Sequence, residues 1–137
     1  MKVIVDASAA ASWLLASQAT PSATELLDRL GAFETSAPHV FQWEIGNLLV
    51  RQTRRQPGFS LNEAFAVLDD LRITLAPPTG REAVRALAGI AAARGLSLFD
   101  AGYLWLAMQT DGALASRDES LLAAATAAGV DVFDLRD

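Results

Sequence analysis

The order of strand-like and helix-like segments is the feature that most restricts the fold of this 137-residue chain. Short runs of strand-forming residues alternate with longer amphipathic runs from one end of the sequence to the other. Strands separated by helices pair mainly in parallel, and a parallel sheet needs helices on both faces to cover it. The pattern therefore predicts an α/β fold with three layers (α/β/α) and a central, mainly parallel, five-stranded sheet.

Proline, glycine and capping residues mark the boundaries of the expected elements. We predict strands at residues 3–5, 34–37, 73–76, 112–116 and 130–135. We predict helices at residues 7–16, 22–31, 40–56, 60–71, 79–95, 97–108 and 118–128. No linker, internal repeat or low-complexity segment interrupts the series, so residues 1–137 are expected to form a single domain.

The composition restricts the chemistry of any metal site. The chain has no Cys, which excludes disulfides and thiolate ligands and indicates a reducing, cytoplasmic compartment. The single histidine, His39, follows Pro38 in a predicted turn and has no neighbour at ligand spacing, so we expect a structural role for it. No apolar run reaches the roughly 18 residues of a membrane span, and Asp6 interrupts the stretch that otherwise looks like a secretion signal.

Four carboxylates occupy positions where an α/β protein binds ligands. Asp6 follows the first strand, Glu44 lies in helix 40–56, Asp100 is near the start of helix 97–108, and Asp118 follows the fourth strand. Ligands of parallel sheets gather at the carboxyl ends of the strands, so Asp6 and Asp118 can meet if their strands are neighbours. Each acid also has an ordinary interpretation: a helix N-cap for Asp6 or Asp118, a capping box for Asp100, a solvated charge for Glu44.

The surroundings of two of these acids favour a metal site. Trp43 and Ile45 flank Glu44, and Phe99 precedes Asp100. A carboxylate beside apolar surface is costly unless it is paired or bound to a cation. Because the chain has one lysine and one histidine, buried counter-charges would have to be arginines, and a divalent cation is the better interpretation. Oxygen ligands without cysteine favour Mg²⁺, with Mn²⁺ as the alternative.

Four motifs, in order, resemble the signature positions of PIN-domain nucleases, and most of all the VapC toxins of bacterial toxin-antitoxin pairs. The motifs are VIVDAS with Asp6 and Ser8, an E-x-x-N-x-L helix with Glu44 and Asn47, LSLFDA with Asp100, and LASRDE with Ser116 and Asp118. The resemblance covers the whole chain. Ser116 stands where many relatives carry Thr, a departure that keeps the hydroxyl.

The resemblance implies a Mg²⁺-dependent endoribonuclease that hydrolyses RNA phosphodiester bonds. Asp6 and Asp100 would be the metal ligands, Glu44 and Asp118 would complete the acidic pocket, and the two serines would support the acids. A further acid, Glu119 or Asp111, stays open. The resemblance also implies a small cognate antitoxin and self-association as a homodimer.

The net charge of −5 argues at first against an RNA-binding protein. The arginines are unevenly spread, however, and Arg51, Arg54 and Arg55 cluster at one helix end. At 100° per residue, Arg51 and Arg55 fall within about 40° of Glu44, so one helix face runs from acid to base. This face either binds RNA or simply complements the helix dipole.

Aromatic residues offer a second possible contact with RNA, by base stacking. Trp13, Trp43 and Trp105 all lie in apolar helical segments, however, so we expect them in the core or in a subunit contact.

Other functions place demands that the sequence does not meet. A phosphotransferase of haloacid-dehalogenase type needs a second Asp two residues after the first, where this chain has Ser8. A response-regulator receiver domain needs a lysine late in the fold, and Lys2 is the only lysine. The strongest rival is a non-catalytic PIN-like module that binds RNA or protein.

Overall fold

All five strands of the protein join one parallel sheet. The computed structural model describes residues 1–137 and contains β1 (Lys2–Val5), β2 (Glu34–Ala37), β3 (Thr74–Leu75), β4 (Ala113–Ser116) and β5 (Val132–Asp134). The strand order is β3-β2-β1-β4-β5, and every pairing is parallel. The predicted five-stranded sheet is confirmed, and it is wholly rather than mainly parallel.

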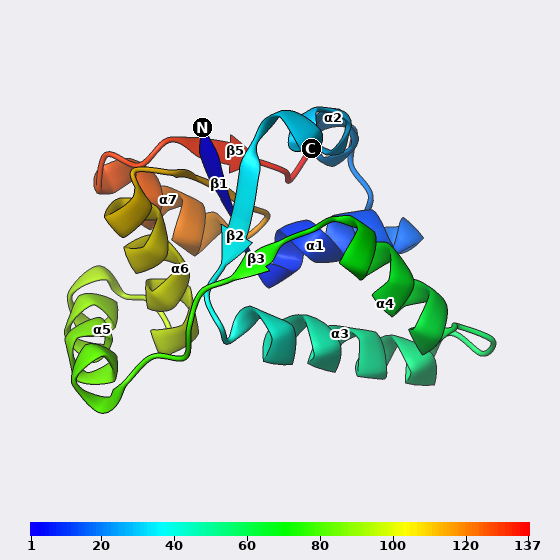
Figure 1. Cartoon of the computed structure of the whole chain (residues 1–137), viewed down its shortest axis with the longest axis horizontal. Coiled ribbons are helices and arrows are strands. Elements are labelled where there is room, and N and C mark those ends of the chain that lie inside the picture. Colours follow the sequence, from blue (N-terminus) through cyan, green and yellow to red (C-terminus); the bar gives the residue numbers. More distant parts are fainter.

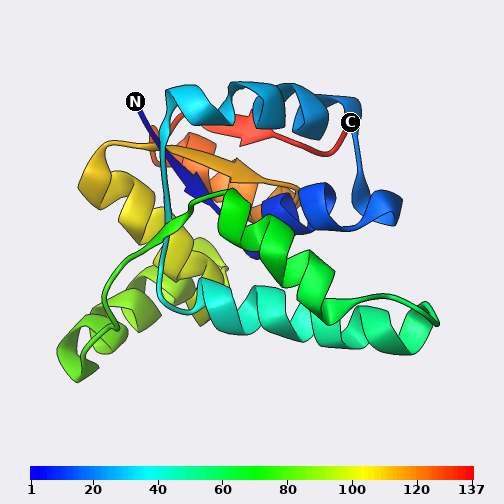
Figure 2. The same ribbon diagram turned by 45° about the vertical axis from the view of Figure 1, so that its right-hand side comes forward.

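Helices cover both faces of this sheet. They are α1 (Ala7–Leu14), α2 (Pro21–Arg29), α3 (Phe41–Arg55), α4 (Leu61–Asp70), α5 (Arg81–Arg94), α6 (Leu98–Thr110) and α7 (Glu119–Ala127), with short 3₁₀ turns η1 (Ala16–Gln18) and η2 (Leu30–Ala32). Figure 1 shows α1, α3 and α4 together on one side of the strands and α5, α6 and α7 on the other, and Figure 2 shows the same division. The three-layer α/β/α architecture is therefore confirmed.

The core forms around β1, because this strand lies at the centre of the sheet. Val3, Ile4 and Val5 are completely buried, as expected for a strand that is covered on both faces. The edge strand β3 has only two residues, both exposed, and is shorter than the predicted strand 73–76. An edge strand pairs on one side only, so less of its predicted length is drawn into the sheet.

Local capping signals locate most helix starts. Ser60 and Ser97 accept hydrogen bonds from the N–H groups of Glu63 and Asp100, each at 3.1 Å, as their spacing predicts. The third predicted start was wrong: Gly80 rather than Thr79 is the N-cap of α5, and it makes no side-chain capping bond. The first helix also ends at Leu14, because the chain tightens there into η1.

The three tryptophans do not share one environment. Trp13 packs against the core, and its indole N–H donates to the Ala23 carbonyl at 2.8 Å. Trp105 is half-buried, whereas Trp43 is 74% exposed. Of the two expected positions, the core is excluded for Trp43, which lies on the side of α3 opposite to the buried Phe41 and Ile45, and the subunit contact stays a prediction. No helix is long and apolar enough to cross a membrane.

Candidate active site

The centre of the sheet brings the ends of β1 and β4 together. β1 pairs with β4 in parallel, with Val5 opposite Ala115, and the Asp6 N–H continues the pairing by donating to the Ala115 carbonyl at 3.2 Å. β2 lies on the other side of β1, so the strand order reverses between β1 and β4. Clefts of parallel sheets open at such reversal points. Asp6 and Asp118 follow these two strands, as predicted.

A network of hydroxyl and backbone donors holds the Asp6 carboxylate, which is 4% exposed. Its Oδ1 accepts from the Ala9 N–H at 2.8 Å and from the Ser8 hydroxyl at 2.7 Å, and its Oδ2 accepts from the Ser116 hydroxyl at 2.5 Å. The Ala9 contact makes Asp6 the N-cap of α1. Both predicted supporting serines thus touch Asp6 and fix its orientation.

The four carboxylates line one cavity of about 240 Å³. Asp6 comes from the β1–α1 junction, Glu44 from the first turn of α3, Asp100 from the first turn of α6, and Asp118 from the β4–α7 junction. The other lining residues are Ala7, Ser8, Asn47, Leu48, Arg51 and Tyr103. The structure therefore gathers all four predicted acids, together with Ser8, Asn47 and Arg51.

Burial and the repulsion between neighbouring acids make the ionised form of this cluster less favourable. Burial raises the pKa of Asp6 to about 6, against the opposing effect of its hydrogen bonds, and the Asp100 charge raises it further. Burial and the charges of Asp118 and Glu44 raise the pKa of Asp100 to about 6 as well. Burial is the larger cause of both shifts, and the charges of the neighbouring acids add to it.

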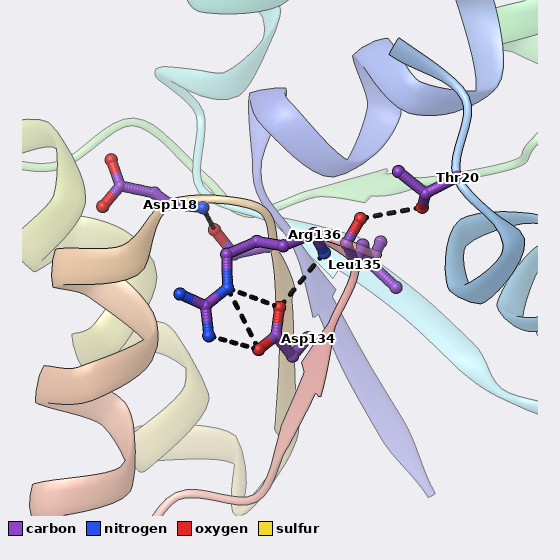
Figure 3. Close-up of polar contacts among 6 residues, drawn as sticks. Thr20, Asp118, Asp134, Leu135 and Arg136 are labelled. Atoms are coloured by element: carbon purple, nitrogen blue, oxygen red, sulfur yellow. Dashed lines mark hydrogen bonds and ion pairs between the residues drawn. The ribbon is translucent and has the colours of Figure 1, made fainter.

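No basic side chain neutralises the four acids. The two ion pairs of the protein are Lys2–Glu34 and Arg136–Asp134. In Figure 3 the guanidinium of Arg136 faces Asp134, and the Asp118 carboxylate points away from that pair. Arg51 lines the cavity but forms no ion pair, so the cavity keeps an excess of negative charge.

Tyr103 is a residue of the cavity that the sequence analysis missed. Its hydroxyl donates to Oε1 of Glu44 at 2.7 Å, and the side chain is only 1% exposed. Burial and the neighbouring Glu44 charge raise the pKa of Tyr103 far above its ordinary value, so the hydroxyl stays protonated and donates. Its place three residues after Asp100, on the same helix face, was the available signal.

Other predicted residues lie outside this cavity. Ser116 is fully buried behind Asp6, where its hydroxyl also accepts from the Asp118 N–H at 2.9 Å. Arg55 lines a separate, smaller cavity. Neither candidate for a further acid lines the site: Asp111 is the C-cap at the far end of α6, and Glu119 is exposed at the start of α7.

A family model identifies the domain that carries these four acids. The family model for the PIN domain matches residues 3–127. The chain belongs to the PIN domain family. PIN domains are typically nucleases and usually bind divalent metals such as Mg²⁺, so a cluster of carboxylates at the centre of this domain agrees with a nuclease site.

The fold is shared with a solved structure of low sequence identity. It is "Crystal Structure of PAE2754 from Pyrobaculum aerophilum", with a TM-score of 0.72 and 18% sequence identity, covering 97% of this chain and 90% of that one. At this identity the likeness concerns the fold alone. No curated protein sequence matches the chain.

The donor set of the PIN site fits a hard divalent cation. All four acids offer oxygen atoms, and no basic side chain forms an ion pair with them. Burial, together with the charges of neighbouring acids, raises the pKa of Asp6 and of Asp100. The acids are not drawn into a closed cage, since no three of them are spaced to enclose an ion. A cation at this site would therefore bind only a few of these oxygens directly and keep water in its remaining positions, as Mg²⁺ commonly does.

Proposed function

We propose that this PIN domain is a Mg²⁺-dependent endoribonuclease, the toxin of a VapBC-type toxin-antitoxin pair, and that it acts in the cytoplasm. One observation carries the proposal: four carboxylates from four different elements share a single cavity in which no basic residue pairs with them. An arrangement that costs this much electrostatic free energy is hard to explain by stability, and it fits a cation-dependent reaction.

Asp6 and Asp100 would hold the Mg²⁺, or Mn²⁺ in its place, with Glu44 and Asp118 completing the site. Such an ion neutralises phosphate oxygens and lowers the pKa of bound water. The chain's own groups do the positioning. Ser8 and Ser116 lock the Asp6 carboxylate by hydrogen bonds of 2.7 and 2.5 Å.

On the other wall of the cavity, Tyr103 holds Glu44 through the 2.7 Å hydrogen bond to Oε1. Arg51 places the one positive charge of the cavity where a phosphate would otherwise meet only carboxylates. Asn47, one turn before Arg51 on α3, adds an amide to the same wall. These residues would bind and orient the RNA strand over the acids.

An RNA cleavage assay with purified protein tests the nuclease proposal. We expect the wild type to cut single-stranded RNA in Mg²⁺ and to stop in EDTA. Asp100→Asn should lower the rate at least about 100-fold, because it removes a charge that the transition state requires. Asp131→Asn is the matched control, since Asp131 is exposed and lies outside the acidic cavity. Full cleavage by folded Asp100→Asn protein would contradict the assignment.

The rival function is a non-catalytic PIN-like module that binds RNA or protein. Retention of all four acids in one cavity favours turnover over binding alone, because the acids repel a polyanion unless a cation is present. If Mg²⁺-dependent cleavage fails while RNA or a protein partner still binds, this rival function replaces the nuclease.

The antitoxin and the homodimer are proposed from the surface beside the acids. Trp43, next to Glu44, is 74% exposed, and Phe99, next to Asp100, is 53% exposed. Exposed aromatic groups of this size are typical of surfaces that a protein partner covers. Expression of the wild type should arrest bacterial growth, and expression of Asp100→Asn should not. Analytical sedimentation of the purified protein should give the mass of a dimer. Normal growth would contradict the toxin role, and a monomer mass would contradict the dimer.

A further inference from the structure

A second cavity lies beside the acidic one and has the opposite character. It measures about 120 Å³ and is lined by Arg51 and Arg55, by the amides Gln18 and Gln52, and by Ser8, Ala11, Leu15 and Leu48. It contains no acidic residue. Ser8, Leu48 and Arg51 line both cavities, so the two share a wall.

The arginines of this second cavity have no partner in the protein. Neither Arg51 nor Arg55 forms an ion pair. A helix-dipole role does not require arginines to line a cavity beside an acidic site, and Arg54, at the same helix end, lines neither cavity. Arg51 and Arg55 are exposed like Arg54, but they lie on the face of α3 that borders the cavities, so a bound anion can reach both of them.

The wall opposite the arginines comes from α1 and the segment after it, through η1. Gln18, in η1, accepts a hydrogen bond at its Oε1 from the Arg117 guanidinium, which leaves the amide NH₂ of Gln18 as its free donor. Arg117 also donates its backbone N–H to the Ser8 hydroxyl at 2.8 Å. These two bonds tie the α1–η1 wall of the second cavity, which carries Ser8 and Gln18, to Arg117 and so to the Asp118 loop.

We propose that this second cavity is a subsite for the phosphate that adjoins the scissile phosphate of a bound RNA strand. The inference rests on the proposed nuclease function and adds the path of the strand. Arg55 follows Arg51 by one turn of α3, a rise of about 6 Å, which is comparable to the step between successive phosphates of an extended strand. Arg51 contacts the phosphate over the acids, and Arg55 with Gln18 binds the next one.

A pair of short ligands separates this flanking contact from the contact at the acids. UpU has only the central phosphate, whereas pUpUp has one on each side. Each ligand competes with fluorescein-labelled oligouridylate for the protein in Mg²⁺, and the fluorescence anisotropy of the labelled strand measures the competition. The Asp100→Asn protein is used so that the RNA is not cleaved during the measurement. A phosphate contact is independent of sequence, so oligouridylate is a sufficient probe. We expect pUpUp to bind about tenfold more tightly than UpU, as one charge-assisted contact provides.

Two variants test whether Arg55 causes the preference for pUpUp over UpU. Arg55→Gln should bring pUpUp to within about twofold of UpU, while Arg54→Gln, the matched control on the same exposed helix end, should keep the full preference. Both variants are made in the Asp100→Asn protein. Equal binding of UpU and pUpUp by the Asp100→Asn protein itself, or an undiminished preference for pUpUp after Arg55→Gln, would overturn the subsite. If the preference depends on Arg55 but no RNA is ever cleaved, the subsite stands and the nuclease function fails.

Discussion

Neutralising Asp6 should stabilise the protein when no metal is present. The carboxylate is 4% exposed, and its pKa is raised from 3.8 to about 6. A shift of roughly two units corresponds to about 3 kcal/mol, which is what the folded state loses when this buried group is ionised. Asp6→Asn resembles the protonated acid in shape and charge, so it removes that cost while keeping a side-chain oxygen for the Ala9 N–H.

The sign of the effect depends on pH. Because the folded pKa lies above the unfolded one, the native state binds the proton more tightly, and wild-type stability falls as pH rises through about 4 to 6. The gain from Asp6→Asn should therefore be near zero at pH 4, grow through that window, and level off at about 3 kcal/mol by pH 8. In a domain of this size it amounts to roughly 10 °C in Tm.

Thermal unfolding in EDTA at pH 4, 6 and 8 measures this difference. Asp131→Asn, at an exposed aspartate outside the acidic cavity, should leave Tm almost unchanged at all three pH values. Saturating Mg²⁺ should narrow the gap at pH 8, because a ligand that binds only the folded wild type stabilises it by mass action. A destabilised Asp6→Asn protein at pH 8 in EDTA, or a gain that does not vary with pH, would refute the reasoning.

Two further substitutions examine the walls of the acidic cavity. Tyr103→Phe removes the hydrogen-bond donor to Glu44 and changes the side-chain volume little. The Mg²⁺ concentration for half-maximal cleavage should therefore rise roughly tenfold. An unchanged Mg²⁺ concentration would show that the hydroxyl does not position Glu44. Arg51→Glu should weaken RNA binding and lower the dependence of log K on log[salt] by about 0.7 for one lost phosphate contact, measured by anisotropy over a salt series. The same affinity and slope as the wild type would place the strand elsewhere.

The elements that carry the four acids could be predicted because their signals are local. Asp6 and Asp118 come directly after apolar strands, and Asp100 lies in a first turn marked by Ser97. The alternation of strands and helices then implies that the sheet is parallel, and parallel strands place their carboxyl ends on one edge. Local patterns and one topological rule were therefore enough for the cluster.

Contacts between distant elements could not be read in the same way. The hydrogen bond from Tyr103 to Glu44 joins residues 59 positions apart, and it requires α3 and α6, from opposite helical layers, to meet at the edge of the sheet. The second cavity similarly depends on η1 lying across from the end of α3. No local pattern specifies how closely two such helices approach, because side-chain packing sets that distance.

The exposure of Trp43 follows from the helical phase of α3. The apolar residues around Glu44 left a core position and a subunit contact open for Trp43, and the spacing of the apolar residues excludes the core. Phe41, Ile45 and Leu49 form the buried stripe of α3, and Trp43 lies about 200° from Phe41 at 100° per residue. Helical phase, rather than the density of apolar residues, determines which side chains face the core.

The two interpretations of Asp6 and Asp118, as helix caps or as metal ligands, do not exclude one another. Each caps a helix through Oδ1 alone, Asp6 to the Ala9 N–H at 2.8 Å and Asp118 to the Leu121 N–H at 3.0 Å. An ionised carboxylate has about four lone-pair positions, and the hydrogen bonds to Asp6 use three of them. The cap fixes the orientation of the group, which leaves the remaining positions free for a cation. Capping at a strand-to-helix junction is thus a means of presenting a rigid carboxylate at the sheet edge, and the same local signal serves both roles.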